Sequence, residues 1–374
     1  MQLSFTELRS LSSFLGITLF SMFFGAGNLI FSPYMAAQAG ALTPAALLGF
    51  VITAVVLPVS AIVIIAPYGS ASRMISRLWK PLGPVFLTLV YLLIGPCIAI
   101  PRTAGTSLEM WTWLIGSGWM PRILYTVVFF ALASLLALHP GKLKDILGKL
   151  LGPALLVLIL LLCVPVLLHP GNVAQPSAEW ADQPFFTGLQ EGYQTMDILA
   201  AFCFSVVILL NIRQAHLKNV KRALLFAGLT AGVLLAVVYT LLAVSAMSRS
   251  TVLQPLSNGA QILSAMALET WGSAGQVLCG LIFLLACCNV CAGLLASCSE
   301  YFCELLPAIP YRLWLALFAA AGALLAVTGL DSILSWSGQL LSLICPVAIL
   351  LLVTGLFRRP VMGQDPNGSA VSEK

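Results

Sequence analysis

The sequence predicts an all-α integral membrane protein with ten transmembrane helices, and three observations support this. Of the 374 residues, 60% are apolar and 8% are charged, with a mean hydropathy of +1.02. Soluble domains carry about 25% charged residues, so the surroundings we expect are a lipid bilayer. Residues 10–72 contain no charged side chain. The chain is also long enough for about ten spans of roughly 20 residues each.

Ten apolar segments of spanning length follow one another, and turn residues separate them. The expected spans are 11–34, 45–67, 84–107, 121–138, 150–168, 192–212, 222–246, 273–299, 311–329 and 332–357. The turns include Gln38-Ala39-Gly40, His139-Pro140-Gly141 and His169-Pro170-Gly171. The polar start of the chain, Met1 to Ser10, lacks the pattern of a signal peptide.

These spans divide the chain into five parts with an expected orientation. The parts are an N-terminal segment (1–9), five helices (10–168), an external loop (169–191), five further helices (192–357) and a polar tail (358–374). With a cytoplasmic N-terminus, every Lys and Arg except Arg102, Arg122 and Arg249 falls inside. Cytoplasmic loops are enriched in Lys and Arg, so both termini are predicted to be cytoplasmic. Because placement explains the net charge of +5, we expect no nucleic-acid partner.

The ten cysteines and three histidines indicate neither a disulfide framework nor an enzyme. Every cysteine falls within or at the edge of an expected span. Cys287 and Cys291 share a helix face, and with Cys288 they suit either a soft-metal site or, as we favour, close helix packing. Intramembrane hydrolysis needs a nucleophile with its base or paired aspartates. Asp197 is the one carboxylate clearly inside a span, so no enzyme is predicted.

The first span contains the most informative motif, Phe23-Phe24-Gly25-Ala26-Gly27-Asn28. Each Gly costs a helix interior roughly 1 kcal/mol relative to Ala. Within a bilayer, irregular backbone is tolerated only where it is buried in protein or lines a cavity. Secondary transporters build their binding sites at such breaks. The alternative is that this Gly-x-Gly lets a neighbouring helix pack closely.

Five motifs in order give the chain a specific resemblance. They are Gly25–Phe31 with Pro33, Gly95-Pro96 followed by Ile100-Pro101-Arg102-Thr103, Pro140–Leu143, Gly192–Asp197 and Asn258–Leu263. Together they resemble the bacterial branched-chain amino acid:cation symporters over residues 10–357. The resemblance implies two five-helix repeats of inverted topology, with helices one and six broken at the midplane. Family members usually carry about twelve spans, and the two beyond the ten expected here should be peripheral.

The break in helix one is the expected substrate site. Gly25, Ala26 and Gly27 would present free amides at a helix N-terminus, which attracts the carboxylate of an amino acid. Asn28 would offer an oxygen to sodium or a donor to the substrate. Thr103 is expected to line the same site.

Helix six is expected to provide the matching break, but no Gly or Pro occurs between Tyr193 and Asn211. The resemblance places a glycine where Ser205 stands, and Ser205 could satisfy a freed carbonyl group. Phe202 and Phe204 would form the wall of an aliphatic pocket or belong to an ordinary aromatic core. Asp197 should have a partner at membrane depth. Arg102 is the candidate, either as a gating salt bridge or as a static pair.

The coupling ion is expected to be sodium or a proton. Carbonyl groups near Ser21 and Phe24, with Asn28, would form half of a sodium site. The resemblance calls for hydroxyl side chains on helix eight beside Gly293, but this chain keeps only Asn289 and Ser297 as oxygen sources there. Sodium prefers oxygen ligands. We therefore expect weak sodium dependence or proton coupling, with Asp197 as the proton carrier.

The resemblance implies import of leucine, isoleucine and valine by cation symport and alternating access, in the bacterial inner membrane. No cofactor beyond the coupling ion is expected. Three alternatives stay open: carriage of another amino acid such as methionine, uncoupled transport, and a transporter-like sensor that binds an amino acid without moving it. The oligomeric state is not predicted.

Overall fold

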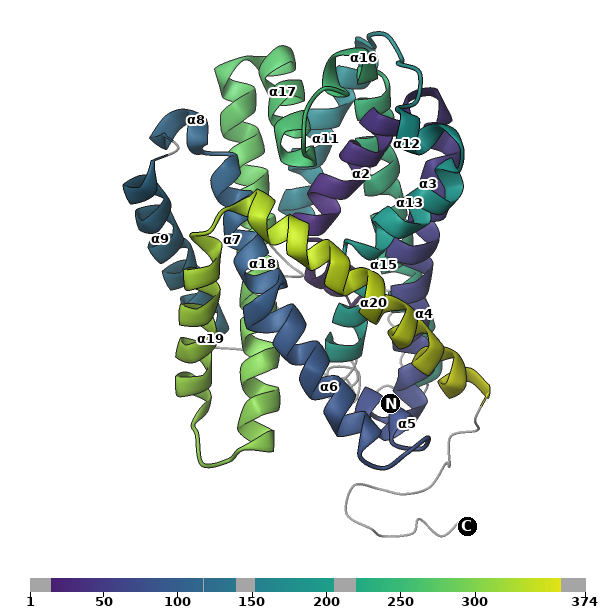
Figure 1. The fold of residues 1–374 in the computed structure, drawn as a ribbon, viewed down its shortest axis with the longest axis vertical. Helices are drawn as coiled ribbons and strands as arrows, with labels where there is room; N and C mark the ends of the chain where they lie inside the picture. The colour runs from purple at the N-terminus through teal and green to yellow at the C-terminus, as the bar shows by residue number, and fades with distance from the viewer. Residues whose placement is uncertain (1–14, 117, 139–151, 205–219, 358–374) are drawn as a thin grey trace, which may run out of the picture.

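The structure, a computed structural model, describes residues 15–116, 118–138, 152–204 and 220–357. All regular secondary structure in these residues is helical, as the sequence predicts. Figure 1 shows long helices packed side by side, with short helices such as α12 and α16 at one end and α5 at the other. The bounds of α5, α12 and α16 are Ala71–Ile75, Ala178–Ala181 and Ser250–Leu253.

The first half of the chain contains several helices that are interrupted or locally widened. Residues 15–23 are helical, the backbone leaves helical geometry at Phe24 and Gly25, and α2 then begins. The α-helices here are α2 (Ala26–Ala39), α3 (Thr43–Val51), α4 (Leu57–Ile65), α6 (Leu82–Leu92), α7 (Ala99–Glu109), α8 (Thr112–Ile115), α9 (Trp119–Ala137) and α11 (Gly152–Leu168). Between them lie the 3₁₀ helices η1 (Gly40–Leu42) and η3 (Ala66–Tyr68) and the wider π-helices η2 (Ile52–Val56) and η4 (Leu93–Cys97). The kink between α6 and α7 lies at Gly95-Pro96, where proline removes a helical hydrogen bond.

The second half also begins with an interrupted helix. Its first part is α13 (Pro184–Tyr193), and after a break the chain is helical again over residues 197–204. The later elements are α15 (Val220–Met247), α17 (Gly259–Trp271), α18 (Ser273–Leu305), α19 (Tyr311–Ala326) and α20 (Leu330–Phe357). In Figure 1 the yellow α20 crosses in front of the other helices at a steep angle.

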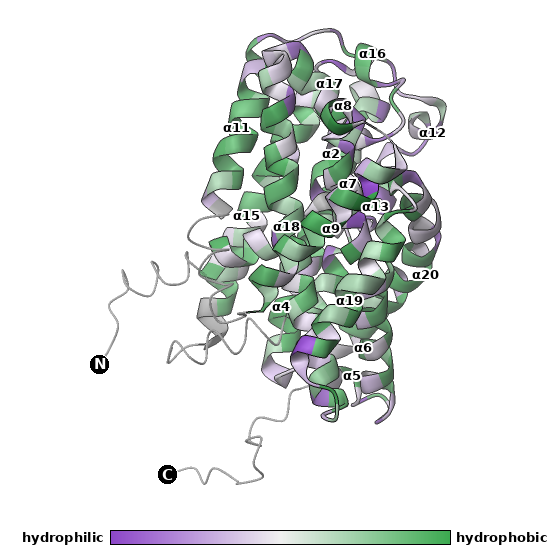
Figure 2. Cartoon of the chain, turned by 90° about the vertical axis from the view of Figure 1, so that its left-hand side faces the viewer, coloured by the Kyte–Doolittle hydropathy of each residue, from purple (hydrophilic) through white to green (hydrophobic). Residues whose placement is uncertain are grey.

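Six stretches of the described chain are long and apolar enough to cross a membrane. They are Gly27–Tyr68, Leu82–Glu109, Trp119–Ala137, Leu224–Met247, Ser273–Leu305 and Leu330–Phe357. Two shorter apolar helices are Pro153–Leu168 and Tyr311–Ala326. Figure 2 shows apolar residues along most of the length of the helices. Many of them are exposed, and Leu324 on α19 is 76% exposed. Such a surface suits lipid. The count of ten spans and the inverted repeats stay predictions.

The segment 169–191 is expected to be an external loop, and its last part belongs to the helix α13. This helix buries one face and lies beside α3 (Figure 1). The contact is close because glycines form it. A Cβ atom on Gly188 would overlap Ala46, and one on Gly49 would overlap the carbonyl group of Phe185. Small residues let two helix backbones approach in this way. The expected boundary at residue 192 therefore falls near the end of a helix.

Candidate functional site

Two helix interruptions meet at the centre of the protein. The first is at Phe24 and Gly25, where Gly25 is extended (φ −139°, ψ −157°) and serves as the N-cap of α2. The second covers residues 194–196, and Met196 adopts a left-handed conformation with φ of 64°. A Cβ atom on Gly27 would lie 3.2 Å from the Cα atom of Thr195. The start of α2 is thus in direct contact with the second interruption.

The second interruption lies at residues that the sequence prediction did not name. The break in helix six was expected near Ser205, where the resemblance places a glycine, with Phe202 and Phe204 beside it. The chain is helical from residue 197 to 204, and the break lies earlier, at residues 194–196. The hydroxyl group of Thr195 donates to the carbonyl oxygen of Gly192 at 2.8 Å, which satisfies one of the carbonyl groups freed there. Ser205 lies outside the described residues.

A cavity of about 30 Å³ lies between the two interruptions. Five of the residues expected to bind substrate line it: Gly25, Gly27, Asn28, Thr103 and Phe204. Phe202 does not line this cavity, because its ring packs edge-on against Phe86 at 5.8 Å. Ala26 begins α2, and its side chain is not described. A water molecule needs about 10–15 Å³ of such space, so the cavity has room for only about two waters.

Asn28 links the first interruption to a buried carboxylate. Its Oδ1 accepts a hydrogen bond from the amide of Gly25 at 2.8 Å. Its Nδ2 donates to Oδ2 of Asp197 at 2.7 Å and also contacts the hydroxyl group of Tyr239. Tyr239 in turn donates to the same Oδ2 at 3.0 Å. Asp197, which is 3% exposed, is therefore held by two neutral donors.

Arg102 lines the same cavity but does not pair with Asp197. Among the described residues, no carboxylate oxygen lies within 4.0 Å of an Arg102 nitrogen. Instead Nη1 donates to the carbonyl oxygen of Gln194 at 2.8 Å, and the guanidinium group lies 5.3 Å from the ring centre of Phe31. The expected salt bridge between Arg102 and Asp197 is therefore wrong for this conformation. Arg102 instead caps the end of α13, where carbonyl groups have no helical partner.

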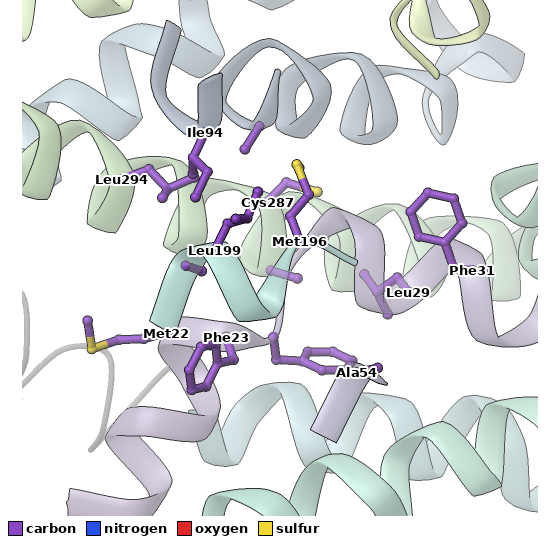
Figure 3. Packing of buried hydrophobic residues seen from close by; sticks show 14 of the residues in the cluster. Met22, Phe23, Leu29, Phe31, Ala54, Ile94, Met196, Leu199, Cys287 and Leu294 are labelled. Atoms are coloured by element: carbon purple, nitrogen blue, oxygen red, sulfur yellow. The ribbon is translucent and has the colours of Figure 1, made fainter. Parts of the chain in front are cut away.

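The rest of the cavity wall is apolar. Met22, Phe23, Ile94 and Leu294 all line it. In Figure 3 these four side chains lie toward one side, and Phe31 lies at the other. Because Phe31 is the ring beneath Arg102, the cavity has a cationic end and an apolar end.

The expected sodium site between helices one and eight contains an amide. Nδ2 of Asn289, on α18, donates to both the carbonyl oxygen and the hydroxyl oxygen of Ser21 at 2.7 Å. Oδ1 of Asn289 is buried without a partner among the described residues. The ring of Phe24 stacks on Phe20 at 5.2 Å. Ser297 lies eight residues beyond Asn289, about 12 Å along a helix. Two of the oxygens expected to bind sodium are thus already hydrogen-bonded.

The cysteines behave as packing residues in the described chain. All ten are free, and eight of them are buried. No group of three or more His, Cys, Asp and Glu side chains there could hold a metal ion. Cys287, Cys288 and Cys291 lie buried within α18.

Sequence reasoning missed Gln194, Met196 and Tyr239 as site residues. Gln194 and Met196 belong to the Gly192–Asp197 motif, but only Asp197 was singled out in it, and nothing in the immediate sequence marks Tyr239. Gln194 contributes a backbone carbonyl group, and Tyr239 lies 42 residues from Asp197. The one available signal was the cost of burying Asp197, which requires a donor from another helix.

Two interrupted helices that meet at a small polar cavity inside an apolar helical protein define a membrane transporter. The sequence matches the family described as branched-chain amino acid transport protein over residues 10–368. The chain belongs to this family, as its motifs predicted.

Several curated relatives are transport proteins rather than enzymes. The branched-chain amino acid permease BrnQ of Bacillus subtilis is 38% identical over 347 residues, covering 90% of this chain and 79% of the relative. BrnQ of Corynebacterium glutamicum is 39% identical, covering 91% and 79%. The branched-chain amino acid transport system 2 carrier protein of Pseudomonas aeruginosa is 36% identical, covering 92% and 80%.

A solved structure shares the fold. Mhp1, a nucleobase-cation-symport-1 family transporter in a closed conformation with bromovinylhydantoin bound, superposes with a TM-score of 0.59. It covers 91% of this chain and 77% of its own at 17% identity, a likeness that concerns the fold alone.

Proposed function

We propose that this protein imports leucine, isoleucine and valine across the bacterial inner membrane by cation symport. The observation that carries the proposal is the cavity where the two interruptions meet, with a helix N-terminus and Arg102 at one end and apolar side chains at the other. The first amides of α2 have no helical partner and suit a substrate carboxylate. The apolar end suits an aliphatic side chain. The names of the relatives agree with this substrate class.

We propose transport by alternating access, and the small size of the cavity supports this. Binding sites for small molecules usually occupy about 300–1,000 Å³, and this cavity is about 30 Å³. A leucine molecule therefore enters only after the helices around the cavity have separated. We place both termini in the cytoplasm, as the distribution of Lys and Arg predicts.

We propose a proton, rather than sodium, as the coupling ion, with Asp197 as its carrier. The amide group of Asn289 donates to both Ser21 oxygens and so competes with a sodium ion for them. Asp197 faces the cavity and is held by neutral donors, so a proton on its carboxyl group requires no ion pair to break. The groups that face it are Asn28, Thr195 and Tyr239, with Arg102 across the cavity.

Uptake of radiolabelled leucine into proteoliposomes tests this function. An inward proton gradient should drive accumulation, a sodium gradient alone should not, and Asp197→Asn should abolish the gradient-driven part. Equilibration without accumulation under either gradient would indicate an uncoupled carrier. Leucine binding without any uptake would indicate a sensor, and both results would overturn the proposal.

A further inference from the structure

Arg102 is a cation enclosed inside the protein, and no carboxylate of the described residues is in direct contact with it. It is 2% exposed and lies on α7, within the apolar stretch Leu82–Glu109. No carboxylate of the described residues lies within 4.0 Å of its nitrogens. A charged side chain at such depth is costly and is normally paired. Asp197 lines the same cavity but is held by Asn28 and Tyr239, so Arg102 has no carboxylate in direct contact.

Most of the donors on Arg102 are free to make that pairing. A guanidinium group has five N–H donors. One bond, from Nη1 to the carbonyl oxygen of Gln194, is its single hydrogen bond within the described part of the chain. This bond and the contact with Phe31 hold the group in place. The remaining donors match the two oxygens of a carboxylate, which arginine binds with two parallel hydrogen bonds.

The position of Arg102 beside α2 adds to this match. A Cβ atom on Gly27 would lie 2.7 Å from Nη2 of Arg102, so the guanidinium group lies against the first turn of α2. The helix N-terminus there carries partial positive charge, and the first amides of α2 have no helical partner. Both features favour an anion at the same place. The amide of Gly25, expected to be free, instead donates to Asn28. Phe31, against whose ring Arg102 lies, is on the opposite side of Figure 3 from Ile94 and Leu294, which leaves that other end for an apolar side chain.

We propose that Arg102 binds the carboxylate of the transported amino acid and thereby fixes its orientation. The substrate carboxylate then supplies an anion in direct contact with Arg102, and the substrate side chain points toward Met22, Phe23 and Leu294. This inference rests on the proposed function, since it assigns a substrate contact within the same site. It makes Arg102 a residue that selects for α-carboxylates.

The test compares leucine with leucinamide, in which a neutral amide replaces the carboxylate. Binding of each is measured by calorimetry on the purified full-length chain in lipid nanodiscs. The wild-type protein should bind leucine roughly 30-fold or more tightly than leucinamide. Arg102→Gln should lose about that factor for leucine, with little change for leucinamide. Arg102→Lys keeps the charge but loses the two parallel N–H donors, so its affinity for leucine should lie between those of the wild-type protein and Arg102→Gln. Arg122→Gln, on α9 and outside the cavity lining, is the matched control and should change neither value.

Equal losses for both ligands in Arg102→Gln would make Arg102 a structural residue, and unchanged leucine binding would also overturn the proposal. Size-exclusion profiles report whether the variants fold. If Arg102→Gln does not fold, the comparison with leucinamide is made with Arg102→Lys. If the wild-type protein binds another amino acid but not leucine, the proposed substrate falls. The comparison is then made with that amino acid and its amide. If it binds no amino acid, both proposals fall.

Discussion

Replacing Asn28 by Ala should be far more damaging than replacing a comparable buried asparagine. Asn28 accepts from the amide of Gly25 and donates to Asp197 and Tyr239. A hydrogen bond to a charged group contributes about 1.5–3 kcal/mol, and a buried amide left unpaired costs about 1–3 kcal/mol. Since neighbouring bonds are not additive, we expect a total loss of about 3–5 kcal/mol.

The chain provides a matched control in Asn258. It is also buried and accepts one hydrogen bond, from the amide of Gln261 at 3.0 Å, as the N-cap of α17. Its Nδ2 has no partner among the described residues. Asn258→Ala should therefore remove only a capping bond, which contributes about 1 kcal/mol.

The assay is thermal unfolding in detergent together with leucine uptake into proteoliposomes. Asn28→Ala should lower the melting temperature several times more than Asn258→Ala and should abolish gradient-driven uptake, while Asn258→Ala should retain uptake. Equal shifts for the two variants, or normal uptake by Asn28→Ala, would refute the role given to the Asn28 hydrogen bonds.

Three further predictions concern the substrate and the ion. Gly27→Leu should abolish leucine binding without preventing membrane insertion, because its side chain would collide with Arg102 and Thr195; normal affinity in the inserted variant would contradict this. Valine, isoleucine and methionine should compete with leucine, since one methylene changes binding by only about 1–3 kcal/mol, whereas lysine and glutamate should not; competition by glutamate equal to that by valine would show that the pocket is misassigned. Removing sodium should alter uptake little, and saturation at millimolar sodium with indifference to a pH gradient would rule out the proton.

The sequence predicts the helical class and the first interruption well, because both have local causes. An apolar stretch without charges specifies a membrane helix by itself, and Gly25 weakens a helix wherever it occurs. The interruption at residues 194–196 was not predicted, because its cause is not local. Met196 adopts a positive φ with no glycine present, and the end of α13 is capped by Arg102, which lies 92 residues earlier.

In the candidate site, too, the residues marked by local sequence were predicted and those that depend on distant partners were not. Asn28, Gly27 and Thr103 could be found because they belong to, or follow, short motifs. The partner of Asp197 could not be found, because an arginine is the usual choice for a buried carboxylate and the structure uses Asn28 and Tyr239 instead. Which donor reaches a carboxylate depends on helix packing, and sequence spacing does not specify that.

The hydrogen bonds around Asp197 also determine which helices can slide past one another. Asn28, Asp197 and Tyr239 belong to α2, to the helix at residues 197–204 and to α15. Sliding any one of these helices past the other two breaks bonds to a buried carboxylate. By contrast, the side chain of Arg102 contributes one hydrogen bond between α7 and the end of α13. We therefore expect α2, the helix at residues 197–204 and α15 to move together as one body, because separating them breaks the hydrogen bonds to Asp197.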